Sequence, residues 1–331
     1  MLKNRYTMKN RVLMSLAAVA VGVGGLAAAG CGGGDDGGNG GGGDELSGRI
    51  VIDGSSTVAP LSEAAAELFQ QENPGVQVTV GTSGTGGGFE KFCRGEIDIA
   101  DASRPIKDEE IQACEDAGIR YEQIGVANDG LAIAINNDND WAACLTVEQL
   151  NRIWDRGSAV SNWNQIDPSF PDERLTLYGP GTDSGTFDYF TEAINGEEGV
   201  IRTDYNNIGE DDNAAITGVA GERGGMAFIP LSFVEENRDK VKPMAVDGGD
   251  GCVEPSTETV SDGTYAPLGR QLYVYPSDSA LQKPEVLAFL NFYIDNNDEI
   301  AQRALFIPLT DEQRAEAQAK VDSLTDAPPA E

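Results

Sequence analysis

Histidine is absent from this chain of 331 residues. A Ser-His-Asp triad therefore has no base, and the Gly-x-Ser-x-Gly turn of many serine hydrolases does not occur either. The five cysteines include no Cys-x-x-Cys pair, so the usual ligands of a zinc site are missing too. These absences argue against a serine hydrolase and against a metal centre.

Basic residues are scarce as well. The chain has 23 Lys and Arg against 55 Asp and Glu, which gives a formal net charge of −32. Such a charge repels nucleic acid and, at long range, any small anion. Salt screens this field beyond about 10 Å, whereas a buried site acts through donors in direct contact with its ligand. We interpret the acidity as a surface property, related to solubility or habitat, and not as a sign of the ligand.

The N-terminal residues have the composition of an export signal. Four basic residues precede an apolar stretch at 12–29, and Gly30-Cys31 follows it. This resembles a bacterial lipobox, with Ala28 where leucine is usual; ordinary signal cleavage or a retained anchor are the alternatives. We expect residues 1–31 to be removed or lipidated, with Cys31 as a lipid anchor on the outer face of the cytoplasmic membrane. The Gly/Asp-rich segment 32–46 is predicted to be a flexible tether.

Four cysteines remain after Cys31. An even number in an exported chain predicts two disulfides, and four cysteines allow three pairings. We favour Cys93–Cys114, which joins neighbouring segments, and Cys144–Cys252, which closes the middle of the chain.

Apolar runs alternate with helical patterns along the chain, which is typical of an α/β fold. A capping box at Thr146 and Gln149 predicts a helix start, and the acidic run Glu210-Asp211-Asp212 predicts another. The stretch 284–305 is expected to be mostly helical. Strands are predicted at residues 50–53, 76–82, 98–102, 130–136, 175–179, 226–230 and 272–275.

Three of these strands run into turns rich in serine, threonine and glycine, each followed by a helical pattern. The first turn of a helix has unpaired backbone N–H groups and a partial positive charge, which suit an anion. One such turn is usually an ordinary cap, but three in one chain indicate a site for a small tetrahedral oxyanion, since open α/β sheets bind ligands at the carboxyl ends of their strands. The turns are Gly54-Ser55-Ser56-Thr57, Gly81-Thr82-Ser83-Gly84 and Asp183-Ser184-Gly185-Thr186.

Four motifs carry a resemblance to a known family. They are GSSTVAPL, GTSGTGGGF, DIADASRPIK and GTDSGTFDYF, in this order. Together they resemble the phosphate-binding proteins (PstS-like, SphX-like branch) of the bacterial phosphate ABC transporter, from about Gly48 to about Leu309. The resemblance implies a two-lobed periplasmic-binding-protein fold, with residues 47–136 and 268–331 in lobe one and 137–267 in lobe two. It also implies hinge closure on the ligand, a membrane permease as partner, a monomer and no cofactor.

The resemblance further implies a set of site residues, with two departures from the family pattern. Arg104 stands where many relatives have an aspartate that accepts a hydrogen bond from protonated phosphate, and Gly179-Pro180 lies where they have an arginine. Arg104 is expected to supply the missing positive charge, with a surface ion pair as the alternative; Asp183 or Asp101 is expected to be the acceptor, although Asp183 also suits a helix cap. The predicted phosphate-binding residues are Ser56, Thr57, Ser83, Ser103, Arg104, Asp183, Ser184, Gly185 and Thr186.

The expected function is therefore capture of inorganic phosphate outside the cytoplasm, without catalysis. A different oxyanion, such as sulfate or molybdate, is the first alternative, because the usual acceptor is displaced. A secreted phosphatase with a Ser-Lys pair or a metal-carboxylate site is the second. A purely structural envelope protein is the third.

Overall fold

Strands and helices alternate along the chain as the sequence predicts. The computed structural model of this chain describes residues 46–326, so the predicted signal at 1–31, Cys31 and nearly all of the tether at 32–46 lie outside the described residues. The strands are β1 (Ser47–Gly54), β2 (Gly75–Gly81), β3 (Ile99–Ala102), β4 (Ile124–Asn136), β5 (Cys144–Thr146), β6 (Thr176–Gly179), β7 (Asn206–Asn207), β8 (Gly225–Pro230), β9 (Val241–Asp247), β10 (Cys252–Val253) and β11 (Gly269–Pro276).

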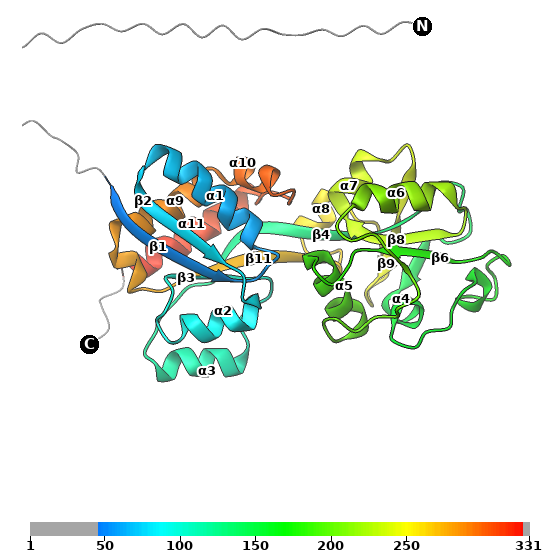
Figure 1. Cartoon of the computed structure of the whole chain (residues 1–331), viewed down its shortest axis with the longest axis horizontal. Helices are drawn as coiled ribbons and strands as arrows, with labels where there is room; N and C mark the ends of the chain where they lie inside the picture. The colour runs from blue at the N-terminus through cyan, green and yellow to red at the C-terminus, as the bar shows by residue number, and fades with distance from the viewer. Residues whose placement is uncertain (1–45, 327–331) are drawn as a thin grey trace, which may run out of the picture. The chain divides into compact units, whose positions relative to one another are not determined.

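The helices lie between these strands and after the last of them (Figure 1). Single 3-10 turns occur at Trp163–Gln165 and Ala280–Gln282. The helices are α1 (Ala59–Glu72), α2 (Gly84–Phe92), α3 (Asp108–Asp116), α4 (Val147–Trp154), α5 (Gly185–Asn195), α6 (Asp212–Gly221), α7 (Leu231–Glu236), α8 (Thr257–Ser261), α9 (Pro284–Asp295), α10 (Asn297–Arg303) and α11 (Asp311–Asp326).

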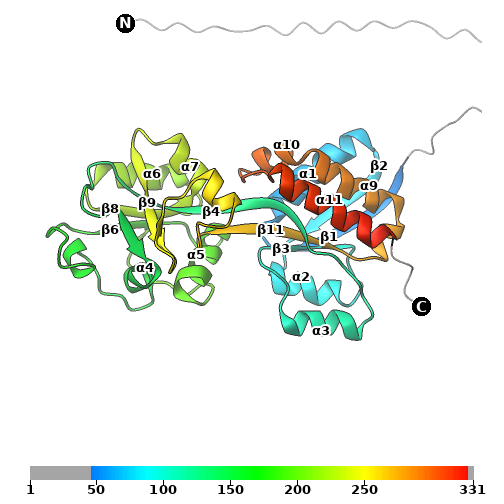
Figure 2. The ribbon, with the colours of Figure 1, turned by 180° about the vertical axis from the view of Figure 1, so that it is seen from behind.

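Eight of the described strands form a continuous sheet in the order β2-β1-β3-β11-β4-β8-β6-β7, and β9 branches from β4 and pairs with β5 and β10. Strand β1 is parallel to β2 and β3, whereas β11 is antiparallel to both β3 and β4. On the β1–β3 part, α1, α9 and α11 cover one face and α2 and α3 the other (Figures 1 and 2). On the β6–β8 part, α6 and α7 cover one face and α4 and α5 the other (Figure 2).

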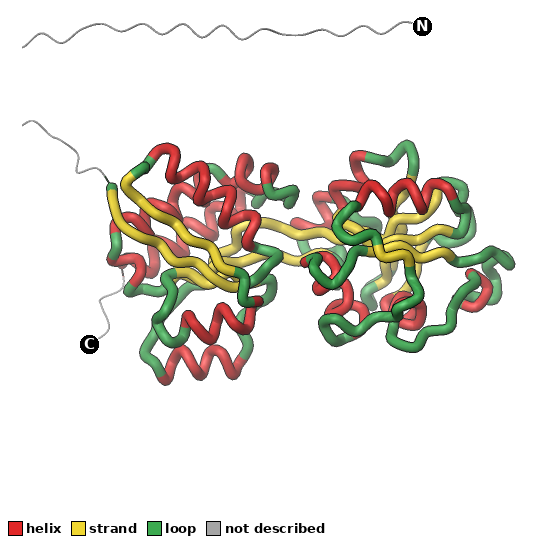
Figure 3. The backbone as a smooth tube through the Cα atoms, in the orientation of Figure 1, coloured by secondary structure: helices red, strands yellow, loops and turns green. Residues whose placement is uncertain are grey.

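The buried apolar side chains form separate cores along this sheet. The residues of one core run from Leu131 to Leu268. A second core, with a small cluster beside it, contains residues before and after that range, from Ile50 to Ala127 and from Leu272 to Leu324. Strand β4 contributes residues to both cores, and β11 pairs with it side by side where the two strands pass between them (Figure 3).

All seven predicted strands are confirmed, some with longer bounds. The Thr146 capping box is present: the Gln149 backbone N–H donates to Thr146 Oγ1 at 3.1 Å, and the Gln149 side chain accepts from the Thr146 N–H. Asp211 caps α6, as the acidic start predicts. The segment 284–305 forms α9 and α10. The sequence reasoning missed α11, whose buried residues Ala317, Val321 and Leu324 give a weak apolar pattern.

Two disulfides join the pairs expected from the sequence. Cys93 at the end of α2 is bonded to Cys114 in α3, and Cys144 in β5 is bonded to Cys252 in β10. The second bond closes a separation of 108 residues, whereas the first closes 21. Among the described helices, none has the length and apolar character needed to cross a bilayer.

Removing the long-range disulfide should destabilise the fold more than removing the short-range one. A cross-link lowers the entropy of the unfolded chain by an amount that grows with the logarithm of the number of residues in the closed loop. We therefore expect the Cys144→Ser/Cys252→Ser variant to lose about 2–5 kcal/mol of unfolding free energy. Urea denaturation followed by tryptophan fluorescence measures this loss. The matched control is Cys93→Ser/Cys114→Ser, with a smaller expected loss; a larger loss in the control would contradict the loop-length argument.

Candidate functional site

The serine-rich turns meet at one edge of the sheet. Ser56 and Thr57 follow β1, Ser83 follows β2 and Ser103 follows β3. Because β1 is parallel to both β2 and β3, the carboxyl ends of the three strands lie together. The parallel pairing of these strands thus brings hydroxyl groups from three segments that are distant in the sequence to one edge of the sheet.

A cavity of about 200 Å³ lies at this edge, which we call the serine cavity. Its walls carry hydroxyl groups, glycine backbone, three basic side chains and three carboxylates. The lining residues are Ser55, Ser56, Thr57, Ser83, Gly84, Thr85, Gly86, Gly87, Ser103, Arg104, Lys107, Asp188, Tyr189, Glu192, Glu198 and Arg270.

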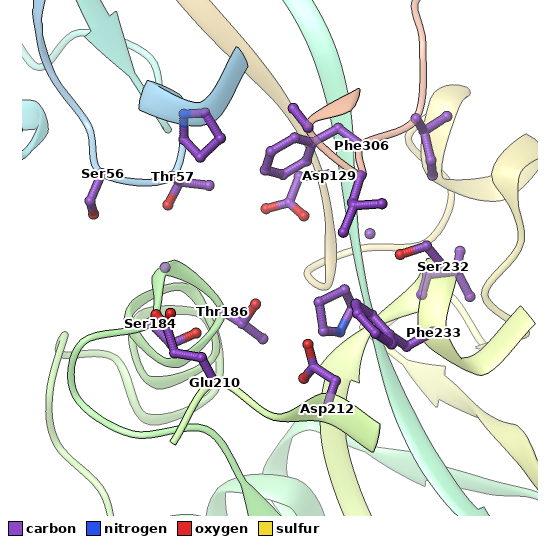
Figure 4. Close-up of a pocket in the computed structure, with 18 of the residues that line it drawn as sticks. Ser56, Thr57, Asp129, Ser184, Thr186, Glu210, Asp212, Ser232, Phe233 and Phe306 are labelled. Carbon is purple, nitrogen blue, oxygen red and sulfur yellow. The ribbon is translucent and has the colours of Figure 1, made fainter. Parts of the chain in front are cut away.

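A second cavity of about 380 Å³ adjoins it, which we call the acidic cavity. It shares Ser56 and Thr57 with the serine cavity. Figure 4 shows these two residues across the cavity from Ser184 and Thr186. Asp183 and Gly185 line it as well. The predicted site residues are therefore divided between two adjoining cavities, and all nine line one or both of them.

Helix α5 directs its N-terminus toward Thr57. Ser184 occupies the N-cap position without a side-chain capping bond, so its hydroxyl is not used by the helix. Gly185 comes so close to Thr57 that an added Cβ would lie 2.7 Å from Thr57 Oγ1. The unpaired N–H groups of the first turn of α5 thus face the hydroxyl-rich turn between β1 and α1.

Hydrogen bonds fix the orientation of the other hydroxyl groups. The Ser83 hydroxyl donates to Asp53 Oδ1 at 2.7 Å, and the Ser103 and Thr85 hydroxyls lie 3.1 Å apart. Burial acts against ionisation of Asp53, but hydrogen bonds from Lys91 and Ser83 outweigh it and lower the pKa of this carboxyl. Asp53 therefore stays ionised and holds the turn after β2 in place.

Arg104 lines the serine cavity, but its guanidinium already has a partner. Its two terminal nitrogens donate to the two carboxylate oxygens of Glu110, each at 2.8 Å. The bidentate geometry expected for an oxyanion is thus directed at a carboxylate of this chain. The Arg104–Glu110 ion pair is largely buried, with side-chain exposures of 20% and 14%. It is therefore more enclosed than the surface ion pair that the sequence analysis gave as the alternative role of Arg104.

Arg270 is a second guanidinium at the site, and the sequence reasoning did not identify it. The register of β11 on β4 sets it opposite Asp129, whose carboxylate accepts from Nε at 3.1 Å. Nη1 donates to the Ser103 carbonyl at 3.2 Å, and the guanidinium stacks on the Tyr189 ring at 3.5 Å. Nη2 is buried and has no hydrogen-bond partner within the described residues.

The acidic residues at the site differ in what they face. Asp188, one turn into α5, lines the serine cavity, and its side chain makes no hydrogen bond within the described part of the chain. Burial first, and then Glu198, raises the pKa of Asp188 to about 6, against the opposing effect of Arg270. Asp183 is exposed and is not the helix cap, since Ser184 occupies that position.

Asp101 lies behind the site and lines neither cavity. Its carboxyl is fully buried in β3 and accepts a hydrogen bond from the Ser62 hydroxyl at 2.9 Å. Burial raises the pKa of Asp101 to about 8, so this group is largely protonated at neutral pH. Asp101 therefore stabilises strand β3, which Ser103 follows, and is not placed to contact a ligand in either cavity. Residues 46–326 contain no cluster of three side chains suited to a metal ion.

Comparisons with known proteins agree with this geometry. The PBP superfamily domain matches residues 39–297. Protein SphX of Synechococcus elongatus is 47% identical over 263 residues, which cover 78% of this chain and 77% of that protein. Phosphate-binding protein PstS of Staphylococcus saprophyticus is 38% identical over 279 residues, covering 84% and 85%. This chain belongs to the PBP superfamily, among the SphX and PstS proteins.

A solved structure extends the match to three dimensions. It is described as a possible phosphate binding protein from Planctomyces limnophilus, is 40% identical and has a TM-score of 0.81. The match covers 85% of this chain and all of that structure. The predicted family and the two-lobed α/β periplasmic-binding-protein fold are confirmed.

In this SphX/PstS relative, the buried Asp101 carboxyl should make stability depend on pH. Its pKa is about 8 when folded against an ordinary value of 3.8, so between these pH values the native chain keeps a proton that the unfolded chain has lost. The unfolding free energy therefore falls as pH rises through this range.

Asp101→Asn keeps an acceptor for Ser62 and removes the titration. We expect the variant to gain at least about 1 kcal/mol relative to the wild type between pH 5 and pH 8.5. Urea denaturation of both proteins at the two pH values measures the difference. Parallel pH dependences would contradict the assignment of a protonated Asp101.

Proposed function

We propose that this protein is an extracytoplasmic receptor that binds inorganic phosphate in the serine cavity and delivers it to an ABC permease. The observation that carries the proposal is that three serine-rich strand ends and the Arg270 guanidinium line the serine cavity, while the α5 N-terminus lines the cavity that adjoins it at Ser56 and Thr57. The printed names of the relatives, phosphate-binding protein PstS among them, support phosphate as the ligand. No catalytic step is part of this proposal.

Hydrogen-bond donors replace the hydration shell of the anion in this proposal. Ser56, Thr57 and Ser103 offer hydroxyl or backbone donors from the β1–β3 side, and the Ser184–Thr186 turn offers them from α5. Ser83 lines the cavity too, but its hydroxyl and its backbone N–H both donate to Asp53 and must turn to the anion on binding. Hydrogen bonds to a charged partner contribute about 1.5–3 kcal/mol each, so several of them offset the loss of hydration. Arg104, Arg270 and Lys107 supply positive charge around the same cavity.

Asp188 is the carboxylate that we assign to the phosphate proton, in place of Asp101 or Asp183. Phosphate carries at least one proton at neutral pH and can donate it to a carboxylate, whereas sulfate carries none. Asp188 faces the serine cavity and has a free carboxylate, whereas Asp101 is buried elsewhere and Asp183 faces the acidic cavity. An ionised Asp188 would repel sulfate because nothing would compensate the contact between two anions.

The two lobes are proposed to comprise residues 47–136 with 268–331, and 137–267. The separate apolar cores support this division, with β4 and β11 as the hinge strands. Closure about these strands would bring Ser184 and Ser56 onto opposite sides of one phosphate ion. We further propose that the mature protein is a monomer anchored through a lipid on Cys31, a residue outside the described range.

The selectivity for phosphate over sulfate should depend on Asp188. Calorimetric titration of the phosphate-stripped full chain at pH 7.5 is expected to give a Kd for sulfate at least about 100-fold above that for phosphate, a gap of about 2.7 kcal/mol. In Asp188→Asn this ratio should fall at least about tenfold, because the amide no longer repels sulfate and can donate to it.

The matched control is Glu197→Gln, which removes an exposed carboxylate just beyond α5 and should leave the ratio unchanged. Equal binding of phosphate and sulfate by the wild type would widen the ligand to oxyanions such as sulfate or molybdate. Absence of binding to any of them would contradict the receptor function. A ratio that survives in Asp188→Asn would contradict the role of Asp188 alone.

A further inference from the structure

A separate cavity of about 220 Å³ lies at the amino end of β6, and we call it the arginine pocket. The strand spans about 10 Å, and the chain reaches the Ser184 turn only beyond the opposite end of β6. The pocket shares no lining residue with the serine cavity or the acidic cavity, so it is a different site from the one proposed for phosphate. Its polar lining residues are Ser161, Arg174, Thr176, Arg202, Asp204 and Asn206.

Arg202 forms one wall of the arginine pocket and is fixed by its own hydrogen bonds. Its side chain is 5% exposed. Nε and Nη2 donate to the two carboxylate oxygens of Asp204 at 2.6 and 2.8 Å, and Nη1 donates to the carbonyls of Ile153 and Val160 at 2.8 and 2.9 Å. The hydrogen bond from Arg202 lowers the pKa of Asp204, which therefore stays ionised. The two charges offset each other, so this pair gives the pocket a rigid wall without net charge.

Arg174 carries the charge that remains in the lining. The residue is exposed, and its guanidinium makes no ion pair or hydrogen bond within the described residues. Burial first, and then Glu222, raise the pKa of Tyr178, whereas the charge of Arg174 opposes this rise, so the guanidinium lies near Tyr178. Glu222 accepts a hydrogen bond from the Tyr178 hydroxyl at 3.3 Å instead of pairing with Arg174. Two guanidinium groups and one carboxylate therefore leave one positive charge in the lining.

Thr176 contributes a hydroxyl group that has no partner. The residue is 8% exposed, and its Oγ1 is buried without a hydrogen bond within residues 46–326. Arg174 and Thr176 are two positions apart in an extended segment, so their side chains leave the same face of the sheet. An unpaired buried hydroxyl destabilises the fold, and a ligand oxygen would remove this cost. The unpaired cation and the unpaired donor are thus neighbours on one face.

Two further polar groups lie at the rim of the arginine pocket. The Ser161 carbonyl accepts from the Leu175 N–H at 2.9 Å, which holds Ser161 beside β6, and its exposed hydroxyl makes no hydrogen bond within the described range. Asn206 Nδ2 donates to the Leu177 carbonyl at 3.0 Å, so the amide is fixed along the same edge. Hydroxyl groups and a guanidinium are donors that suit the oxygens of an anion.

We propose that the arginine pocket binds a small monocarboxylate anion, at a second ligand site that does not depend on the phosphate site. A planar carboxylate accepts two parallel hydrogen bonds from the fork of a guanidinium, and Arg174 has this fork free. The Thr176 hydroxyl donates to one of the same oxygens, and the apolar atoms of Val160 and Leu175 suit a short alkyl group. One positive charge balances one carboxylate, whereas a dianion such as sulfate would leave a negative charge uncompensated beside Asp204.

Acetate is the probe that tests this site, by NMR titration of the ¹⁵N-labelled full chain at pH 7.5. Sodium acetate should cause saturable shifts of the Leu175, Thr176 and Leu177 amides, and sodium sulfate at the same ionic strength should bind there at least about threefold more weakly. Arg174→Gln should weaken acetate binding at least about fivefold, because the amide lacks the charge and the forked donors. Thr176→Val should weaken it about threefold without loss of stability, because the hydroxyl has no partner to lose.

The matched control is Arg156→Gln, at an exposed position outside the pocket, and its acetate affinity should equal that of the wild type. The Kd of Arg174→Gln for inorganic phosphate should be unchanged too, because the two sites share no residue. The inference is overturned by the absence of saturable shifts at residues 175–177, by shifts confined to the Ser56 and Ser184 turns, or by sulfate binding as tight as that of acetate. Equal effects of the two arginine variants overturn it as well. Absence of phosphate binding by the wild type would instead contradict the proposed function, on which this inference does not rest.

Discussion

The guanidinium of Arg270 is the interaction on which the site depends. It joins β11 to β4 through Asp129, reaches the turn after β3 through the Ser103 carbonyl, and stacks on Tyr189 of α5. These four elements are the two strands that we propose as the hinge, the turn that carries Ser103 and the helix whose N-terminus faces Thr57. A flexible cation would not fix them together, but the planar guanidinium provides directed donors and a stacking face at once.

Oriented hydrogen-bond donors such as the Arg270 guanidinium explain how a chain with a net charge of −32 can contain an anion site. The serine cavity has three basic residues and three carboxylates in its lining, so net charge does not make it attractive. Oriented donors act at contact distance, where screening by salt is small, whereas the surface charge acts over distances at which it is screened. In the proposed site, the attraction for phosphate therefore comes from the orientation of the donors, and we assign to Asp188 the selection of phosphate over sulfate.

The sequence allowed the prediction of what is locally encoded. Serine and glycine after apolar runs predicted the turns at Ser56, Ser83 and Ser184, because cap preferences act within a few residues. Arg270 was missed because its partners lie 141 residues away in β4 and 167 residues away after β3, and no local pattern encodes that pairing. The resemblance pointed to Arg104 as the cation, but only the fold reveals Glu110 as its partner.

The acceptor carboxylate illustrates the same limit at shorter range. Asp183, Ser184 and Asp188 lie within six positions, and the identity of the cap residue decides which carboxylate faces which cavity. Strand β3 is buried on both faces, so alternation could not show that Asp101 points away from the ligand. In each case the residue type was recognised, and its direction depended on tertiary packing.

A crystal structure of the protein grown with phosphate tests the central claim most directly. The account predicts one phosphate ion where the serine cavity meets the α5 N-terminus, with donors of Ser56 and Ser184 within about 3.2 Å of its oxygens and the Asp188 carboxylate at a similar distance. Arg270 should remain paired with Asp129 and form the adjoining wall. A phosphate ion bound elsewhere, or bound in contact with neither α5 nor the turn after β1, would contradict the account.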